Sequence, residues 1–106
     1  MISSLKQRKP RLLIRKVVGE SMLPTLKPGE IVVAIRNNNP KVGRIVLVKH
    51  QGIEKVKRIS DIKDNKVYLL GDNSKSSTDS RDFGYIDMEC ILGTVIWPFE
   101  LSTGVL

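Results

Sequence analysis

Ser21 lies in the stretch GESMLPTL, residues 19–26, where it follows an acidic residue and precedes a methionine. A serine hydroxyl in such a stretch commonly caps a turn, because it can bond to nearby backbone N–H groups. The same hydroxyl can act as a nucleophile, but only when a base removes its proton. The first question is therefore whether the chain offers a base for Ser21.

The only histidine, His50, would have to be the base of a Ser-His-Asp triad. It stands in KHQG, which predicts the end of a strand or the turn after it, so we do not expect it to serve Ser21. A Ser-Lys dyad is the alternative. Its lysine must be neutral, and burial in apolar surroundings favours the neutral form because desolvation penalises the charge.

Two lysines, Lys55 and Lys57, stand in the apolar run IEKVKRI. If this run is a strand, alternation places both on one face together with Ile53 and Ile59. Lys57 lies deeper in the run, but parity does not choose between the two. An exposed strand face is the simpler interpretation of both lysines.

A third stretch, GDNSKSSTDSRDFG, concentrates serines, aspartates and an arginine over residues 71–84. It does not match a calcium-binding loop: counted from Asp72, the sixth position is Ser77 instead of glycine and the twelfth is Phe83 instead of glutamate. Its hydroxyls can hold a buried amine, and an Asp-Arg pair can fix such a loop in place.

Short β-strands must position these residues. Turn-forming clusters interrupt the chain often, and the runs between them are rich in valine and isoleucine. These runs are LLIRKVV, EIVVAIR, RIVLVK, IEKVKRI, KVYLL and ILGTVIW. They predict a mostly β fold, a small antiparallel sandwich or partly open barrel, and no stretch shows long helical periodicity.

The chain of 106 residues suffices for one small domain. Its net charge of +7 is concentrated at the N-terminus: the first 16 residues carry six basic and no acidic residues, and the rest carry 12 basic and 11 acidic ones. We therefore expect a flexible basic arm over residues 1–16 and a single domain over residues 17–106. Such an arm can touch anionic lipid, RNA or an acidic partner, but a solvated tail is the simpler interpretation, and we expect no nucleic acid.

No run approaches the roughly 20 apolar residues of a membrane-spanning helix, and the N-terminus is too charged for a secretory signal. We expect a cytoplasmic protein if the chain is full length, and membrane association if an anchor has been removed. We expect the basic arm to make at most peripheral contact with a membrane. The single Cys90 excludes an internal disulfide and is expected to be a buried apolar thiol. The paired Cys/His spacing of a zinc site is missing, so we expect no metal.

In this order the three stretches resemble the boxes of the type I signal peptidase family of serine endopeptidases. GESMLPTLKPGEIVV resembles the family's nucleophile box, KVKRI its lysine box and GDNSKSSTDSRDFG its third box. ILGTVIWPF is similar to the strand that usually closes the domain. The resemblance covers about residues 17–99.

The resemblance implies a role for each matching residue. Ser21 would be the nucleophile, Lys57 the base and Ser77 the residue that orients the lysine amine. Asp79 and Arg81 would form a structural ion pair.

The resemblance implies that two more residues of the nucleophile box support the active site. Met22 directly follows Ser21 in the sequence. Gly19 stands where some members carry a hydroxyl residue that helps to form the oxyanion hole. Here the hole would have to use backbone N–H groups, including that of Ser21.

We expect the chain to differ from typical members of the family, because the residues before the serine box do not resemble a membrane anchor and no large insertion separates the second and third boxes. Short anchorless members of this kind resemble the proteases that mature nickel-type superoxide dismutase by removing a leader. The wording STDSR-FG and the compact length fit that subgroup. The resemblance implies a precursor protein bound as an extended strand and cleaved without a cofactor.

Two other functions are considered. A self-cleaving peptidase of the repressor type also uses a Ser-Lys dyad, but it carries a DNA-binding domain ahead of the cleavable linker, and only about 18 residues precede the serine box here. A small β-barrel module that grips RNA or lipid would need exposed aromatic residues for stacking. The five aromatic residues of this chain are scattered and mostly late.

Overall fold

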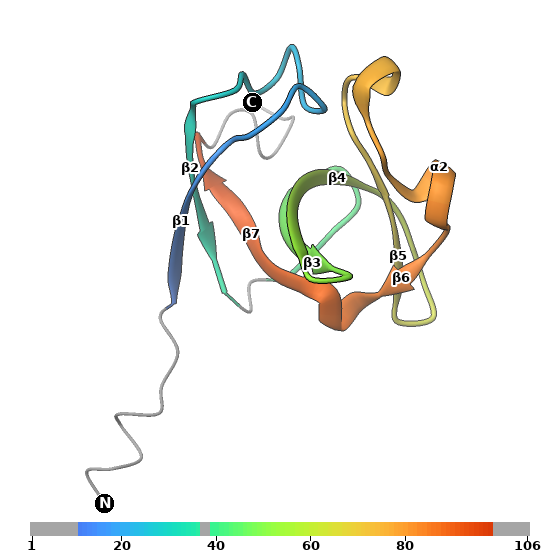
Figure 1. Ribbon diagram of the computed structural model, residues 1–106. Helices are drawn as coiled ribbons and strands as arrows, with labels where there is room; N and C mark the ends of the chain where they lie inside the picture. The colour runs from blue at the N-terminus through green and yellow to red at the C-terminus, as the bar shows by residue number, and fades with distance from the viewer. Residues whose placement is uncertain (1–10, 37–38, 99–106) are drawn as a thin grey trace, which may run out of the picture.

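A computed structural model describes residues 11–36 and 39–98 (Figure 1). Seven strands form one antiparallel sheet in the order β1-β2-β7-β3-β4-β5-β6. They are β1 (Leu12–Lys16), β2 (Ile31–Ile35), β3 (Ile45–His50), β4 (Ile53–Lys63), β5 (Lys66–Leu70), β6 (Ile86–Asp87) and β7 (Ile91–Trp97). The sheet curves around its core without closing, and β1 and β6 are its two edges. The predicted mostly β fold, a small antiparallel sandwich or partly open barrel, is confirmed.

Two tight hairpins join β4, which carries Lys55 and Lys57, to β3 and β5. Gln51 and Gly52 connect β3 to β4, and Asp64 and Asn65 connect β4 to β5. All four residues have positive φ, which is the conformation that a two-residue type I′ turn requires. The turn predicted at KHQG is therefore present, and together the two turns fix the register of β4.

The central strand β3 is buried on both faces and divides the interior into two cores. Ile45 and Leu47 face a first core, while Val46 and Val48 face a second one. Alternation of side chains along an extended strand produces this division. The first core also receives residues from β1, β2, β7 and the 17–26 segment, and the second receives residues from β4, β5 and β6.

The domain begins before residue 17, where we expected a flexible arm to end, because strand β1 already belongs to the sheet. Leu12–Lys16 pair with β2 along their whole length, and Leu13 is buried opposite Ala34. The positive charges at Arg15 and Lys16 do not prevent this, because the alternating pattern sends only Leu13 into the core. The remainder of the expected arm, residues 1–10, lies outside the described residues.

Three short helical turns lie in the C-terminal half: η1 (Ser74–Ser76), α2 (Ser80–Phe83) and η2 (Met88–Cys90). Phe83 of α2 and Met88 and Cys90 of η2 pack against the second core, and Figure 1 shows α2 beside β5. No helix in the described part of the chain has the length and apolar character needed to cross a membrane.

Gly93 of β7 provides a test of the sheet. A Cβ atom added there would lie 2.7 Å from the carbonyl oxygen of Ile35 on β2, a backbone atom that cannot move aside alone. We expect Gly93→Ala to lower the free energy of unfolding by about 1–3 kcal/mol, the usual cost of overpacking. Urea titration measures this loss, with Ser60→Ala on an exposed position of β4 as the control. Equal stability of the two variants would contradict the close approach of β2 and β7.

Candidate active site

Ser21 stands in a tight turn that both neighbouring segments anchor in the first core. Val17 before it and Met22 after it are 5% and 1% exposed, and Leu26 is completely buried. Backbone N–H groups of Leu23 and Leu26 donate to the carbonyls of Glu20 and Met22 at 3.1 and 2.9 Å. The turn therefore holds the half-buried Ser21 between fixed points.

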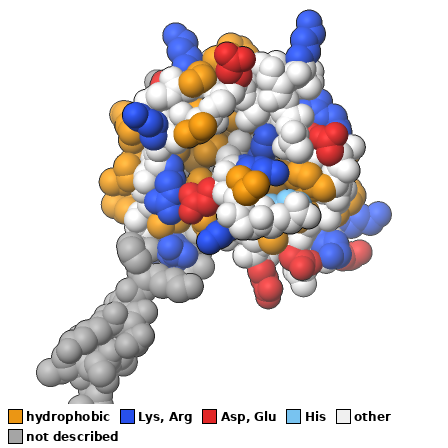
Figure 2. All heavy atoms as spheres, viewed as in Figure 1, with side chains coloured by type: hydrophobic (Ala, Val, Ile, Leu, Met, Phe, Trp, Pro, Cys, Tyr) orange, Lys and Arg blue, Asp and Glu red, His pale blue; other side chains and the backbone are white. Residues whose placement is uncertain are grey.

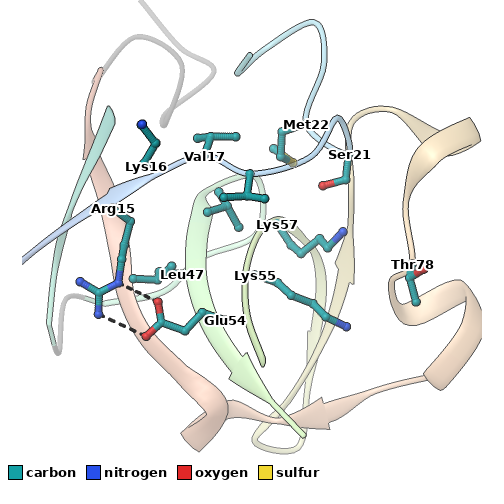
Figure 3. A pocket seen from close by; sticks show the side chains of 12 residues that line it. Arg15, Lys16, Val17, Ser21, Met22, Leu47, Glu54, Lys55, Lys57 and Thr78 are labelled. Atoms are coloured by element: carbon teal, nitrogen blue, oxygen red, sulfur yellow. Dashed lines mark hydrogen bonds and ion pairs between the residues drawn. The ribbon is translucent and has the colours of Figure 1, made fainter. Parts of the chain in front are cut away.

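Ser21 and Lys57 line the same pocket, which has a volume of about 320 Å³ (Figure 3). In this view the Ser21 hydroxyl and the Lys57 amine lie on the same side of the pocket, and no hydrogen bond joins them. The pocket is lined by Arg15, Lys16, Val17, Val18, Ser21, Met22, Leu47, Glu54, Lys55, Val56, Lys57 and Thr78. One wall thus comes from β1 and the Ser21 turn, and the other comes mainly from β4.

Lys57 is buried, with 3% of its surface exposed. It pairs with Val46 of β3 and shares a face of β4 with Ile59, and both of these residues belong to the second core. Burial lowers the pKa of Lys57, the charge of Asp79 opposes this effect, and the charges of Lys55 and Arg81 add to it. The net pKa is lowered, which makes the neutral amine more accessible than in an exposed lysine.

The structure distinguishes Lys57 from Lys55, which strand parity alone does not. Lys55 is only half-buried, and its Nζ lies 4.9 Å from the centre of the Phe83 ring. Lys57 Nζ instead donates a hydrogen bond of 3.0 Å to Ser77 Oγ. Of the two, Lys57 has the buried amine and the hydroxyl partner that the resemblance assigns to the base.

Ser77 links the amine of Lys57 to the buried carboxylate of Asp79. Its hydroxyl donates to Asp79 Oδ2 at 2.5 Å and accepts from Lys57 Nζ. An ionised carboxylate only accepts, so the single hydroxyl proton of Ser77 is committed to Asp79. Ser77 can therefore only accept from Lys57, and this arrangement engages an N–H of the lysine while leaving the lone pair of a neutral amine free.

Asp79 is completely buried and anchors the whole loop. It accepts from Gly71 N–H at 2.8 Å, from Arg81 Nε at 3.0 Å and from Arg81 Nη2, and it caps α2 in a reciprocal box with Asp82. Burial alone would raise the pKa of Asp79, but the hydrogen bonds from Arg81, Gly71 and Ser77 outweigh this and hold the pKa well below its usual range. Asp79 and Arg81 form the ion pair that the resemblance implies.

The turn of Ser21 and the loop of Ser77 are packed directly against each other. Asn73 N–H donates to the Ser21 carbonyl at 2.8 Å, and the Asn73 side chain donates to the Glu20 carbonyl at 3.1 Å. A Cβ atom on Gly71 would lie 2.3 Å from Ser77 Oγ and 2.7 Å from the Ser21 carbonyl oxygen. Only glycine therefore allows both segments to approach at this point.

A second set of interactions, which sequence reasoning missed, joins three segments of the site. Arg58 donates to both carboxylate oxygens of Asp72 at 2.9 and 2.8 Å and to the Gly43 carbonyl at 2.8 Å. Thr25, four residues after Ser21, donates to the same carboxylate. The sequence contains only a weak signal for these contacts: Arg58 directly follows Lys57, and Asp72 is the second residue of the third stretch. Nothing in the spacing indicated that they meet.

Gly19 and Ser21 lie where the resemblance implies that backbone N–H groups form the oxyanion hole. Gly19 has a φ of +83°, which glycine adopts without strain, and it is exposed at the start of the turn. The N–H of Ser21 donates to no other described residue. It is therefore available to an oxygen atom that enters the pocket.

Neither His50 nor Cys90 lines the pocket of Ser21. His50 is the last residue of β3, as the KHQG pattern predicts, and its ring stacks on Phe83 with centroids 4.5 Å apart. Cys90 is half-buried and packs against the second core, so it is less enclosed than expected. Within the described residues, no group of three or more His, Cys, Asp or Glu side chains is arranged to hold a metal.

We expect Asp79→Asn to lower the free energy of unfolding at pH 7 by about 2–3 kcal/mol, because a buried, charge-assisted set of hydrogen bonds is disrupted. The pKa of Asp79 is lowered in the folded state, so its contribution is complete above the unfolded pKa of about 3.9 and disappears as pH falls through the folded value. Urea titrations between pH 7 and pH 2 should therefore show the unfolding free energies of the wild-type chain and of Asp79→Asn converging as pH falls. A gap that stays constant would refute this role.

No curated protein matches this chain. Residues 1–96 match the family described as Peptidase S24-like, and this range includes the Ser21 turn, β4 and the loop of residues 71–84. The match covers nearly the whole chain and agrees with a pocket that holds a serine and a buried lysine. The chain therefore belongs to the Peptidase S24-like family and is a serine peptidase in general type.

Proposed function

We propose that this chain is an endopeptidase with a Ser-Lys dyad, in which Ser21 is the nucleophile and Lys57 the general base. One observation carries the proposal: a buried lysine amine shares a pocket with a serine and is hydrogen-bonded to a hydroxyl, not to a carboxylate. A direct carboxylate partner would stabilise the charged amine, raise its pKa and so deplete the neutral form that can accept a proton. The lowered pKa of Lys57 instead favours the neutral form that a base requires.

In the first half of the reaction, the lone pair of Lys57 takes the proton of Ser21 as Oγ bonds to the carbonyl carbon of the substrate. The resulting oxyanion accepts from backbone N–H, including that of Ser21, and one such donor contributes roughly 3 kcal/mol in other serine proteases. The carbon–nitrogen bond then breaks, and protonated Lys57 returns its proton to the leaving amine. An ester on Ser21 and a free amino terminus are the products of this half.

In the second half, neutral Lys57 takes a proton from water as the water oxygen attacks the ester carbon. The bond to Ser21 Oγ breaks, and protonated Lys57 gives this proton to the serine. Throughout both halves, Ser77 and Asp79 keep the amine oriented. The Arg58–Asp72–Thr25 contacts keep the Ser21 turn beside β4.

The substrate we propose is a precursor protein whose N-terminal leader binds as an extended strand. Support comes from the shape of the pocket, which has the β1 segment as one wall and β4 as the other. Extended peptides bind such sites through main-chain hydrogen bonds.

A nickel superoxide dismutase precursor is the narrower proposal. It rests on the resemblance of the loop STDSR-FG to that subgroup of proteases. It is also consistent with the two-residue turn between β4 and β5, which leaves no room for an inserted subdomain between the lysine and the third box.

We expect Ser21→Ala and Lys57→Met each to reduce cleavage of a precursor by about 10⁴-fold or more, because residues that act as a unit lose most of the rate when either is removed. Mass spectrometry of a candidate precursor after incubation measures the loss. Near-normal cleavage by Lys57→Met would disprove the choice of base. Incubation of the purified chain alone is the control, and fragments cut from the chain itself would favour the self-cleaving type.

Lys57→Met should at the same time stabilise the fold by about 1 kcal/mol at neutral pH, because a poorly solvated amine is replaced by an apolar side chain of similar length. The folded-state pKa of Lys57 is lowered, so its penalty is complete below that pKa and vanishes above the unfolded value of about 10.4. Thermal melts at several pH values test this. Loss of activity together with loss of stability would indicate a merely structural lysine.

The pH profile of kcat/KM gives an independent test. Activity should rise with pH as Lys57 loses its proton, with a midpoint below the usual lysine value. The charge of Asp79 raises the pKa of Lys57 and that of Lys55 lowers it, so Asp79→Asn should move the midpoint down and Lys55→Gln should move it up. Midpoints that coincide in all three proteins would argue against Lys57 as the titrating group.

A further inference from the structure

The pocket beside Ser21 is rich in positive charge. Among the side chains that line it, four are basic, namely Arg15, Lys16, Lys55 and Lys57, and one is acidic, Glu54. Figure 2 shows Lys and Arg side chains gathered around the centre of this face with few acidic side chains between them.

The acidic side chain is already occupied. Arg15 Nε and Nη2 donate to the two carboxylate oxygens of Glu54 at 2.6 and 3.2 Å, and this pair spans the pocket from β1 to β4 (Figure 3). Glu54 is therefore not available to Lys55 or to a basic substrate side chain. Among the described residues, no carboxylate lies within ion-pair distance of Lys16 or Lys55.

Lys55 is the lysine best placed to use this charge. Figure 3 shows its amine directed to the same side as that of Lys57, whereas the Lys16 amine points away from Ser21. Its contact with the Phe83 ring, 4.9 Å to the centroid, restrains the amine without neutralising it. The side chain is half-buried, so an ion pair formed there is less screened than one on the open surface.

The spacing of Lys55 from Lys57 defines which substrate residue it would meet. The two lie two positions apart on one face of β4, a separation of about 6.6 Å along a strand. Alternate side chains of an extended substrate have the same spacing. With the scissile carbonyl beside Lys57 and Ser21, Lys55 lies beside a side chain about two residues away.

We propose that Lys55 determines specificity, by selecting substrates that carry an aspartate or glutamate about two residues from the scissile bond. This inference rests on the proposed peptidase function and adds the charge of the substrate to it. Lys55 does not take part in bond breaking; apart from its effect on the pKa of Lys57, it acts on the choice of substrate.

A library of synthetic peptides, randomised at every position, tests the inference without knowledge of the natural precursor. Mass spectrometry of the products identifies the cut sites of the wild-type chain. We expect acidic residues at the second position on one side of the cut to be enriched over basic ones by about threefold or more, the scale of a partly exposed ion pair.

The charge-reversal variant Lys55→Glu should invert this preference toward lysine and arginine, and Lys55→Gln should abolish it. The preference of the wild-type chain should also weaken as salt concentration rises. Lys63→Glu, an exposed substitution with the same change of charge on the same strand, is the matched control and should keep the wild-type preference. Because a ratio of cut sites is compared, a change in overall rate does not affect the result.

Two failures are distinguishable. If the wild-type chain cuts no peptide of the library and no precursor, the proposed peptidase function fails. If it cuts peptides and Ser21→Ala does not, but the wild-type chain shows no acidic preference or Lys55→Glu leaves the preference unchanged, the peptidase survives and the specificity role of Lys55 is overturned. Thermal melts of both Lys55 variants confirm that the comparison is made between folded proteins.

Discussion

The site depends on how a single amine is buried without a direct counter-charge. Lys57 Nζ is bonded to Ser77 Oγ, and the carboxylate of Asp79 is one hydroxyl further away. If that carboxylate touched the amine, the charged form would be stabilised and the lone pair lost. If no carboxylate were present, Ser77 could donate to the amine and occupy the same lone pair. The intervening serine therefore fixes both the direction of the hydrogen bond and the position of the amine.

Much of the fold was predictable, since local chemistry determines it. The β-branched runs and the turn residues at 51–52 and 64–65 place β3, β4 and β5. The strand order was not predictable, because β7 inserts between β2 and β3, and this pairing joins segments far apart in the chain. Charge patterning was misleading at residues 12–16. The positive charges at Arg15 and Lys16 indicated a solvated arm, whereas the burial of Leu13 and pairing with β2 incorporate the segment into the sheet.

In the site, too, local chemistry predicts some features, whereas others depend on contacts between distant segments. Strand parity correctly placed Lys55 and Lys57 on one face, but the choice between them depends on what covers that face. The loop of residues 71–84 supplies Ser77 above Lys57 and Phe83 beside Lys55. That cover is a tertiary contact, so it is not encoded in the spacing of IEKVKRI. The Arg58–Asp72–Thr25 contacts were not predictable for the same reason. The sequence around each residue does not indicate its partners, and only folding brings the three together.

Gly71 explains why the serine and lysine segments form one unit. Its missing side chain allows Ser77 Oγ and the Ser21 carbonyl to approach the same backbone position, while its N–H donates to Asp79. A displacement of the Ser77 loop is thereby transmitted to the Ser21 turn through adjacent atoms and through Asn73. Positioning of reacting groups to within a fraction of an ångström requires such support from rigid neighbours. Ser21, the proposed nucleophile, is thus held by the same residues that hold the Lys57 amine, although the two come from opposite walls of the pocket.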